Sequence, residues 1–573
     1  MHASPRIEVV PSRRTVSSAL VELLRGEGFR RSFGIAGGAI LPIFDALRAG
    51  GLDPIQFRHE AGAVFAALEC ELAGGGGAVV FTTTGPGLTN ALTGIAAARA
   101  EGARVVLVSG ATGPLRRRRY AFQETSMSAM ANLGLFGDGG WFDLAELVES
   151  PAQLVGLAPR LREGLRRPQG FAAHLCLPLS VQDADVDADE LEDDRGFACF
   201  PASPDPAALA TCGDWLARGP VVVWVGHGAT KAASEVRALV DELGAWVMAT
   251  PRGKGVFPES HPRYLGVTGF GGDEAVFDRL AAIHPATTLV LGSRLGEFSS
   301  FWDPRYVADR VVHVDLDPRV FGATYSGNRQ TLGVAAEIGR FTASLRAQVP
   351  ARRVEPVARP PRLAELHSVT TLTASGDANG VRPSALMAAI QRRVVDASSA
   401  IVLSEAGNAF VWATNRLRFD QPGRYRTSMG FGSMGHAATG VVGAALATGG
   451  PAVALVGDGS MLMNNEITTA VQLGTASVWV VLNDSRLGLV DDGMQGLGYA
   501  GGLDFPRVDF VRVAEAMGAR GIRVSHAAEL DAALDHALAA GGPFVVDVLI
   551  DPSEPAPFGA RNRSISQQTG AST

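Results

Sequence analysis

Two apolar runs that read as β-strands flank a helical segment between Val453 and Val490, and this arrangement constrains the fold more than any other part of the sequence. The first run ends in a Gly-Asp-Gly turn at residues 457–459, and the second ends in an Asn-Asp pair at residues 483–484. A strand, a helix and a second strand form the unit of a parallel sheet, and ligands bind where its strands end. Asp458 and Asp484 are therefore predicted at neighbouring strand tips, where their oxygens suit Mg²⁺ or Ca²⁺. Because such a metal completes its coordination shell with water and substrate phosphates, the segment also indicates a diphosphate ligand.

The alternative for this segment is an ordinary strand–helix–strand unit in which Gly-Asp-Gly is only a turn. The Asn-Asp pair, separated from that turn by residues 460–482, favours the metal site. The pattern resembles that of the thiamine diphosphate (ThDP) enzymes, although Asp484 stands where that family usually has asparagine. The resemblance implies that the backbone carbonyl of Arg486 is the third protein ligand of the metal. It also implies cofactor contacts from both strand ends, at Gly457, Asp458, Gly459, Ser460, Asp484, Leu487 and Gly488.

Three α/β blocks separated by two polar segments account for most of the 573 residues, which are too many for one core. The ThDP resemblance implies an α/β fold of three doubly wound parallel-sheet domains. They are a pyrimidine-binding domain, a central domain and a diphosphate-binding domain. An acidic run between the first two blocks reads as a solvated linker, with an acidic partner site as the alternative. The predicted boundaries are 1–182 for the pyrimidine-binding domain, 183–204 for the acidic linker, 205–350 for the central domain, 351–382 for a second linker, 383–555 for the diphosphate-binding domain and 556–573 for a tail.

Composition limits the partners and the compartment. The net charge of -7 argues against nucleic acid and anionic membranes as partners. The four cysteines show neither metal-ligand spacing nor a disulfide framework, which favours a reducing cytoplasm. We also find no secretory signal and no apolar run of membrane-spanning length, so a cytoplasmic protein is expected.

Glu60 opens a strongly helical stretch after Phe57-Arg58-His59. An acidic residue at a helix start has a simple alternative explanation, since the helix dipole favours it there. ThDP, however, requires a carboxylic acid beside the N1′ nitrogen of its pyrimidine ring. The diphosphate motif therefore makes Glu60 the predicted catalytic and cofactor-binding acid.

Other segments of the first block resemble acetolactate synthase and its relatives: residues 33–47, residues 82–98, and Ala-Phe-Gln-Glu at 121–124. The resemblance implies that Gln123 is an active-site residue, with Phe122 lining the same cavity. A polar surface residue is the alternative for Gln123. Two further cofactor contacts are implied within residues 82–98, namely Gly85 and Asn90.

The third block contains two more such segments, at residues 404–408 and 428–447. They imply cofactor contacts from Gly407, Asn408 and Gly432, and a wedge between the two cofactor rings from Met434. A bent cofactor brings its reacting groups together. Taken alone, Met434 reads equally well as a core filler. Residues 249–266 and 311–322 extend the resemblance to the central block, where some relatives bind FAD; the sequence does not decide whether this chain does.

The chain departs from acetolactate synthases in two segments that recognise small 2-oxo acids. It has no basic residue between Glu124 and Trp141, and no tryptophan follows the metal motif. A wider or differently shaped substrate pocket is expected. The chain also has no His-His pair of the kind that many related decarboxylases use as a proton relay.

The resemblance implies a ThDP- and Mg²⁺-dependent carboligase that decarboxylates a 2-oxo acid and couples the acyl-anion equivalent to a second carbonyl compound, giving an acyloin-type product. A homodimer or homotetramer with active sites at the subunit interface is implied with it. The alternatives are a 2-oxo acid decarboxylase or lyase that releases an aldehyde and, more remotely, a non-catalytic subunit. A nicotinamide-dependent dehydrogenase is disfavoured, because the Gly-x-Gly-x-x-Gly of residues 430–435 does not follow an apolar strand.

Overall fold

A computed structural model of the chain describes residues 14–124, 135, 137–186, 202–325, 329–348 and 380–558. The chain divides between Cys199 and Phe200 into two compact units. Most of both predicted linkers, 183–204 and 351–382, and most of the predicted tail, 556–573, lie outside the described residues. The domain boundaries placed in those segments stay a prediction.

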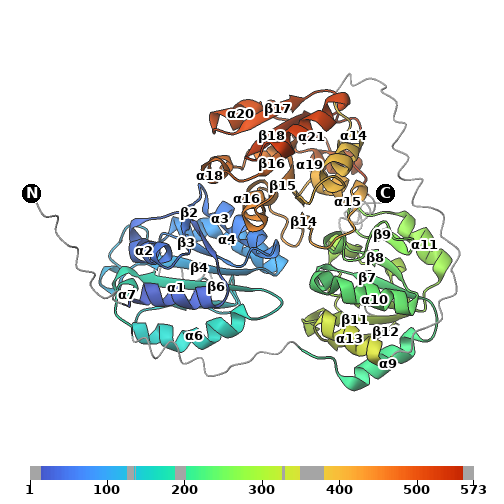
Figure 1. Ribbon diagram of the computed structural model, residues 1–573, viewed down its shortest axis with the longest axis horizontal. Helices are drawn as coiled ribbons and strands as arrows, with labels where there is room; N and C mark the ends of the chain where they lie inside the picture. Colours follow the sequence, from blue (N-terminus) through green and yellow to red (C-terminus); the bar gives the residue numbers. More distant parts are fainter. Residues whose placement is uncertain are drawn as a thin grey trace, which may run out of the picture. The chain divides into compact units, whose positions relative to one another are not determined.

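The first unit is built on a six-stranded parallel sheet of order β2-β1-β3-β4-β6-β5. Its strands are short and almost wholly apolar, as expected when helices cover both faces of a sheet (Figure 1). The strands are β1 (Arg31–Gly34), β2 (Pro54–Gln56), β3 (Ala78–Thr82), β4 (Arg104–Ala111), β5 (Leu144–Leu147) and β6 (Phe171–Pro178). The helices are α1 (Val16–Gly26), α2 (Leu41–Ala49), α3 (Glu60–Leu72), α4 (Pro86–Glu101), α6 (Pro151–Leu165) and α7 (Leu179–Gln182).

The second unit contains two more six-stranded parallel sheets, the first of them central in the sequence, with the order β12-β11-β10-β7-β8-β9. Its strands are β7 (Val221–Val225), β8 (Trp246–Ala249), β9 (Tyr264–Val267), β10 (Thr287–Leu291), β11 (Arg310–Asp315) and β12 (Gln330–Ala335). Its helices are α9 (Pro206–Leu216), α10 (Ala233–Leu243), α11 (Ala275–Ile283), α12 (Glu297–Ser300) and α13 (Ile338–Gln348).

The C-terminal sheet has the order β14-β13-β15-β16-β18-β17. Its strands are β13 (Ile401–Ser404), β14 (Tyr425–Thr427), β15 (Ala452–Gly457), β16 (Ser477–Asn483), β17 (Arg520–Val524) and β18 (Phe544–Leu549). Its helices are α14 (Pro383–Ile390), α15 (Asn408–Arg416), α16 (His436–Thr448), α17 (Asp458–Met461), α18 (Ile467–Leu473), α19 (Gly488–Gly496), α20 (Phe510–Ala516) and α21 (Leu530–Ala539).

These three parallel sheets confirm the predicted α/β fold class. The strand order reverses between β1 and β3, between β7 and β10, and between β13 and β15, and the first and third sheets reverse again at β6-β5 and β18-β17. Ligands of open α/β sheets bind outside the carboxyl ends of the strands at such a reversal. A ligand-binding site is therefore expected at the loops after β1, β3, β13 and β15.

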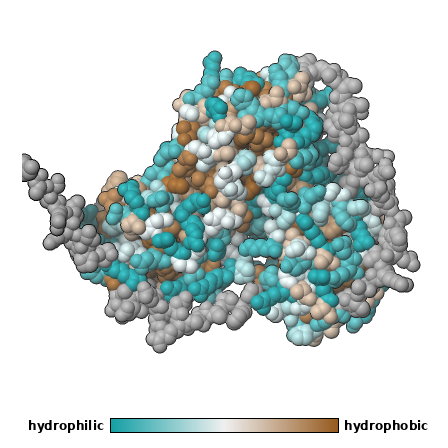
Figure 2. Space-filling model, in the orientation of Figure 1, coloured by the Kyte–Doolittle hydropathy of each residue, from teal (hydrophilic) through white to brown (hydrophobic). Residues whose placement is uncertain are grey.

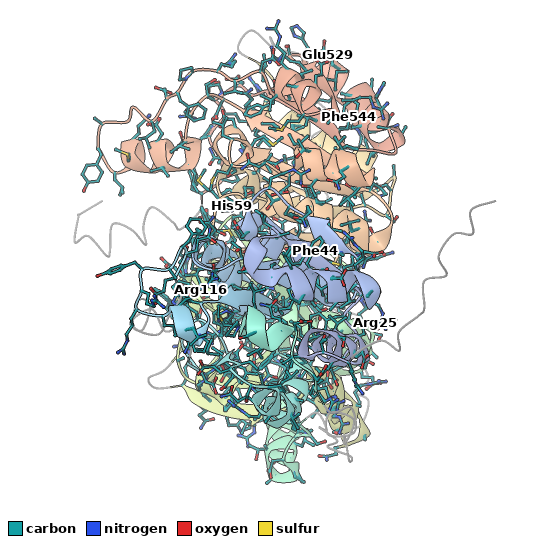
Figure 3. All side chains as sticks on the ribbon, turned by 90° about the vertical axis from the view of Figure 1, so that its left-hand side faces the viewer. Arg25, Phe44, His59, Arg116, Glu529 and Phe544 are labelled. Atoms are coloured by element: carbon teal, nitrogen blue, oxygen red, sulfur yellow. The ribbon has the colours of Figure 1, made fainter. Side chains whose placement is uncertain are left out.

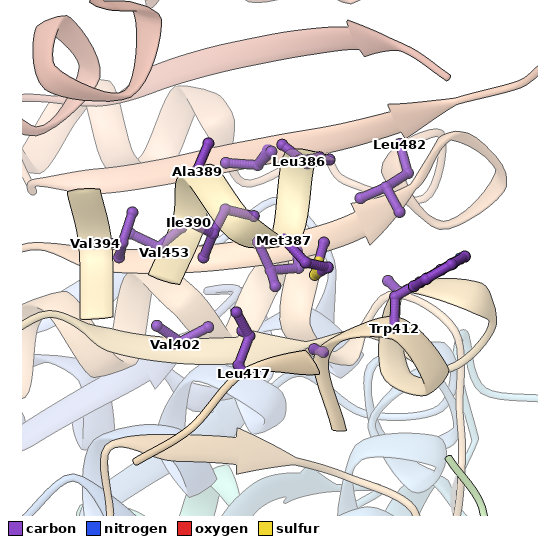
Figure 4. Packing of buried hydrophobic residues seen from close by; sticks show 14 of the residues in the cluster. Leu386, Met387, Ala389, Ile390, Val394, Val402, Trp412, Leu417, Val453 and Leu482 are labelled. Atoms are coloured by element: carbon purple, nitrogen blue, oxygen red, sulfur yellow. The ribbon is translucent and has the colours of Figure 1, made fainter. Parts of the chain in front are cut away.

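The core of the C-terminal domain is a continuous apolar cluster between its sheet and the helices that cover it. Leu386, Met387 and Ile390 of α14 pack with Val402 of β13 and Val453 of β15, and all five are buried (Figure 4). Full burial of such a side chain contributes about 1.5–3 kcal/mol. This core holds the strands whose carboxyl ends carry the predicted metal ligands.

None of the described helices has both the length and the apolar character that crossing a bilayer requires.

Candidate functional site

Glu60 is the first residue of α3, and its side chain is only 6% exposed. The helix begins there because His59 adopts extended backbone angles and its ring nitrogen Nδ1 accepts a hydrogen bond from the Ala61 amide, at 3.1 Å. The carboxylate oxygen Oε2 of Glu60 accepts a hydrogen bond of 3.1 Å from Nδ2 of Asn90 in α4. Two predicted site residues, Glu60 and Asn90, are therefore in direct contact.

The turn between β3 and α4 depends on two glycines. Gly85 has φ 60° and ψ -110°, a conformation open essentially only to glycine, and it precedes the first residue of α4. A methyl group on Gly87 would lie 3.3 Å from Oε1 of Glu60. Glycine at these positions lets the backbone pass close to the carboxylate without covering it.

Gln123 lies beside this glycine turn. Its Oε1 accepts a hydrogen bond of 3.2 Å from the hydroxyl of Thr84, and a methyl group on Gly85 would lie 3.1 Å from its Cβ. The first unit thus brings Glu60, Gly85, Asn90 and Gln123 to one edge of its sheet. Phe122, which was expected to line a cavity beside Gln123, is 89% exposed.

Asp458 and Asp484 follow β15 and β16, whose register pairs Gly457 with Leu482. Asp458 is 2% exposed, and its two carboxylate oxygens accept hydrogen bonds from the amides of Gly459 (2.8 Å) and Ser485 (2.6 Å). Ser485 has φ 61°, which is uncommon for a residue with a side chain and characteristic of functional loops. The predicted neighbouring positions of the two aspartates at the strand tips agree with the structure.

Both carboxylates lie in an environment that opposes their simultaneous ionisation. Burial and, next, the nearby Asp484 raise the pKa of Asp458 to about 7, although backbone amides stabilise the ionised form. Burial also raises the pKa of Asp484, and the cation of Arg486 opposes that rise. A divalent cation between two such groups stabilises both in the ionised state.

The side chain of Arg486 forms an ion-pair cluster that the sequence interpretation missed, since only its backbone carbonyl was assigned a role. Its Nε lies 3.2 Å from Oδ2 of Asp484, and its Nη1 lies 3.2 Å from Asp491 and 2.9 Å from Asp492. An aspartate at position 484 adds a negative charge that the asparagine implied by the family resemblance would not have. The side chain of Arg486 offsets that charge. The sequence did contain a signal for this contact, because Arg486 lies within six residues of Asp484, Asp491 and Asp492.

The described residues contain no cluster of three or more histidine, cysteine, aspartate or glutamate side chains that would hold a metal ion. A metal at Asp458 and Asp484 would therefore complete its shell with backbone, water or cofactor oxygens. Mg²⁺ is bound in this way, through one or two carboxylates together with substrate phosphates. The donor set fits the predicted ion and its diphosphate partner.

Gly459 and Gly488 allow close packing next to these aspartates. A methyl group on Gly459 would lie 2.8 Å from Cδ2 of Leu487 and 3.5 Å from Cε of Met434. A methyl group on Gly488 would lie 2.9 Å from both Nδ2 of Asn408 and Oδ2 of Asp484. The second unit therefore brings these predicted contact residues close together: Asn408, Met434, Gly459, Asp484, Leu487 and Gly488.

Two buried polar atoms, one in this group of residues and one next to it in sequence, have hydrogen-bonding capacity that a ligand could satisfy. Oδ1 of Asn408 and the hydroxyl of Ser433 have no hydrogen-bond partner among the described residues. Buried polar groups of native proteins are nearly always paired, with a ligand where protein and water do not serve. A diphosphate cofactor fits them. The other predicted contacts adjoin these residues in sequence: Gly407 precedes Asn408, Gly432 precedes Ser433, and Gly457 and Ser460 flank Asp458 and Gly459.

Glu405 is a further residue of this region to which the sequence interpretation gave no role. It is 1% exposed, and its Oε2 accepts hydrogen bonds of 3.1 Å from the amides of Ala437 and Ala438 in the first turn of α16. Burial raises the pKa of Glu405, against the effects of His436 and of these amides. Glu405 thereby fixes the start of α16 directly after the loop that carries Met434.

Three family models together match most of the chain. They are described as the thiamine pyrophosphate enzyme N-terminal TPP binding domain (residues 14–131), central domain (217–345) and C-terminal TPP binding domain (405–548). Thiamine pyrophosphate, or TPP, is another name for ThDP.

Relatives are similar over nearly their whole length. A probable acetolactate synthase large subunit of Methanocaldococcus jannaschii is 27% identical, with 95% of this chain and 93% of the relative covered. The acetolactate synthase isozyme 3 large subunit of Escherichia coli is 29% identical, with 93% and 94% covered. A putative thiamine pyrophosphate-containing protein of Bacillus subtilis is 27% identical, with 95% of this chain covered.

Proposed function

The chain belongs to the ThDP-dependent, acetolactate synthase-like enzyme family, and from this we propose that it is a Mg²⁺-dependent carboligase. It decarboxylates a 2-oxo acid and joins the resulting acyl-anion equivalent to a second carbonyl compound. The single observation that carries the proposal is the pair of carboxylates at neighbouring strand tips, the buried Asp458 and the partly buried Asp484, with Gly488 packed closely against Asp484. The predicted acid Glu60 supports it.

In this proposal Asp458 and Asp484 hold Mg²⁺, with the backbone carbonyl of Arg486 as a third ligand. Asn408, Ser433 and the backbone around Gly459 bind the diphosphate. Met434 and Leu487, whose side chains both approach Gly459, hold the rings of the cofactor in place.

When bound, ThDP supplies a nucleophilic carbon and a positively charged ring that accepts electrons as carbon dioxide leaves. The protein binds, orients and exchanges protons. Glu60, held by Asn90 at the start of α3, exchanges a proton with the pyrimidine ring. Gln123, held by Thr84, faces the substrates from the same sheet edge.

Ligation rather than aldehyde release is proposed because the described part of the candidate site offers few groups to protonate the reacting carbon. Gln123 is an amide and does not donate a proton in this way. A 2-oxo acid decarboxylase or lyase remains the second candidate, since it would use the same cofactor site. A non-catalytic role is less well supported, because Glu60, Asp458 and Asp484 are all present.

We also propose a cytoplasmic homodimer or homotetramer in which the pyrimidine-binding domain of one chain and the diphosphate-binding domain of another complete each site. Hydrophobic side chains reach the surface of the C-terminal domain (Figure 2), and Leu462 and Met463, just after α17, are each 53% exposed. Apolar surface beside a site supports an interface between subunits. Small molecules, rather than nucleic acid or membranes, are the proposed partners.

FAD binding by the central domain is supported by charge at the strand reversal between β7 and β10. Burial and then Arg252, Arg426, Lys231 and Arg294 lower the pKa of His227, so these cations lie near enough to act on the residue that follows β7 and Gly226. Such a cluster suits the diphosphate of a dinucleotide. Heat denaturation should then release flavin, which is detected by its fluorescence. If protein purified with added FAD releases no flavin, this part of the proposal is excluded.

The experiment that tests the proposed activity is a screen of paired 2-oxo acids and aldehydes with ThDP and Mg²⁺, analysed by mass spectrometry. Coupled products that have lost one carbon dioxide are expected. Aldehydes alone, even with excess acceptor, would identify a decarboxylase. Absence of ThDP-dependent thermal stabilisation would point to a non-catalytic subunit.

A further inference from the structure

Four consecutive arginines, Arg116–Arg119, stand in the loop between β4 and Gln123. We name residues 113–122 the arginine loop. The apolar residues at both ends of its basic run project outward, since Leu115 is 88% and Tyr120 100% exposed. In a chain of net charge -7 this is a local concentration of positive charge that the proposed reaction has not used.

The arginine loop lies at the same sheet edge as Glu60. Strands β2, β3 and β4 are parallel, so the segments that follow them, which carry Glu60, Gly85 and the arginine loop, all leave one edge. The contacts of Gln123 with Thr84 and Gly85 join the end of the arginine loop to the glycine turn beside Glu60. In Figure 3, His59 and Arg116 lie on the same side of the N-terminal domain, whereas Arg25 lies on the other.

The backbone of the arginine loop is held in an unusual form. Arg118, Tyr120 and Gln123 have φ values of 59°, 55° and 54°, in the left-handed region that residues with side chains rarely adopt. The amide of Arg118 donates a hydrogen bond of 2.8 Å to Oε1 of Glu124, which stabilises this path. Strained residues of this kind cluster at ligand-binding sites.

One arginine anchors the loop and the other three extend outward. Arg117 forms an ion pair of 2.6 Å with Glu149 and donates to the carbonyl of Thr112 at 3.1 Å. Arg116, Arg118 and Arg119 are exposed, and no ion pair of theirs is present among the described residues. The anchored residue therefore sets the position of three solvent-facing guanidinium groups.

We propose that Arg116, Arg118 and Arg119 bind a second anionic group on one of the two substrates. That substrate then carries a phosphate or a further carboxylate in addition to its reacting carbonyl or 2-oxo acid group. Guanidinium groups bind both kinds of anion through paired, charge-assisted hydrogen bonds. This inference rests on the proposed function, and it assigns to the arginine loop the substrate recognition that the resemblance to acetolactate synthases would place after Glu124, where this chain has no basic residue before Trp141.

The test compares substrates that differ only in charge. Pyruvate with glyceraldehyde is the reference pair, pyruvate with glyceraldehyde 3-phosphate adds a phosphate, and 2-oxoglutarate with glyceraldehyde adds a carboxylate. In the variant Arg116→Gln/Arg118→Gln/Arg119→Gln, the KM of the preferred charged substrate should rise roughly tenfold or more, since each lost contact involves a charged group. Its kcat and the kinetics of the reference pair should stay near those of the wild type.

The matched control is Arg25→Gln/Arg30→Gln/Arg48→Gln. These arginines are exposed, and they lie at the C-terminal ends of α1 and α2 and before β1, at the opposite edge of the sheet. The control removes the same charge at the opposite edge of the sheet. Its KM values should therefore match those of the wild type. An equal KM change in both triple variants would show that the effect comes from net charge alone, and it would overturn the inference. A wild-type protein that prefers the reference pair to both charged pairs would also overturn it.

A binding measurement separates this inference from the proposed activity. Calorimetric titration of the ThDP-loaded protein with glycerol 3-phosphate, glutarate and glycerol requires no turnover. Wild-type and control proteins should bind at least one of the two anions but not glycerol, and the arginine-loop variant should lose that binding. Anion binding without any coupled product would leave the inference standing and refute the carboligase. Equal or absent anion binding in wild type and variant would refute the inference alone.

Discussion

Asp484 and Arg486 act as a pair at the proposed metal site, because the guanidinium of Arg486 lies 3.2 Å from a carboxylate where the family resemblance implies an amide. Arg486→Gln should leave three carboxylates without their counter-ion, and it should lower the free energy of unfolding of the metal-free protein by about 1–3 kcal/mol. The same change should strengthen Mg²⁺ binding several-fold, since a competing cation is removed. Urea unfolding without metal and calorimetric Mg²⁺ titration with ThDP check the two effects.

The control for this prediction is Asp484→Asn, which restores the residue typical of the family. It should weaken Mg²⁺ binding and reduce the cost of the Arg486→Gln change when the two are combined. Additive effects in the double variant would show that the two side chains do not act as a pair.

The pKa of Asp458, raised to about 7, makes metal binding depend on pH. Between the ordinary aspartate pKa of about 4 and this value, the native protein holds a proton that the unfolded chain has lost. The metal-free protein should therefore lose stability as pH rises from about 4 to 7 and should lose no more from this group above that. Mg²⁺ displaces the proton, so its apparent affinity should rise up to about pH 7 and then level off.

Calorimetry in two buffers with different ionisation enthalpies measures this proton directly. Proton release on Mg²⁺ binding is expected at about pH 6 and should be nearly absent at about pH 8. Equal release at both values would mean that Asp458 is not the titrating ligand.

At the scale of elements, a buried lysine of the central domain, Lys254, joins that domain to the C-terminal end of α15. Lys254 and Glu259 have fully buried side chains 2.9 Å apart, and Nζ of Lys254 also donates to the carbonyls of Thr414 (3.3 Å) and Leu417 (2.9 Å). Burial is the main reason that the pKa of Lys254 is lowered to about 8. The pair thereby satisfies the C-terminal end of the helix that begins at Asn408.

Lys254→Met should lower the free energy of unfolding by about 3–5 kcal/mol, because it removes the nearest cation from the buried carboxylate of Glu259 and leaves it with Arg418 at 3.9 Å. Lys254→Met/Glu259→Leu should cost much less, because no unpaired charge remains. Denaturant unfolding of both variants and of the wild type measures the difference. A double variant as unstable as the single one would contradict this role for the charge.

The sequence predicted the elements well, because β16 and β15 are apolar runs of the right length and because glycine and aspartate mark their ends. That pattern was enough to place Asp458 beside Asp484 and to start α3 at Glu60. It was not enough for Lys254, whose carbonyl partners lie 160 and 163 residues away, or for Glu405, which contacts a helix start more than 30 residues away. Such contacts depend on how segments pack, which local sequence does not encode.

At the scale of the whole molecule, the proposal that each site uses two chains predicts complementation between inactive variants. Glu60→Gln and Asp458→Asn should each be inactive alone. In a mixed dimer one site would contain both changes and the other neither, so randomly reassorted subunits should recover about a quarter of wild-type activity. Coupled-product formation after co-refolding measures this, with differently tagged chains to confirm exchange. No recovery despite confirmed exchange would place each site within one chain.

Hydrogen exchange at the C2 carbon of bound ThDP tests the central claim most directly, because it needs no knowledge of the substrates. The wild-type protein with ThDP and Mg²⁺ should exchange this hydrogen for deuterium much faster than free ThDP does. Glu60→Gln should bind the cofactor with similar affinity but exchange it slower by orders of magnitude, while Asp458→Asn should fail to bind it. Exchange at the wild-type rate in Glu60→Gln would contradict the account.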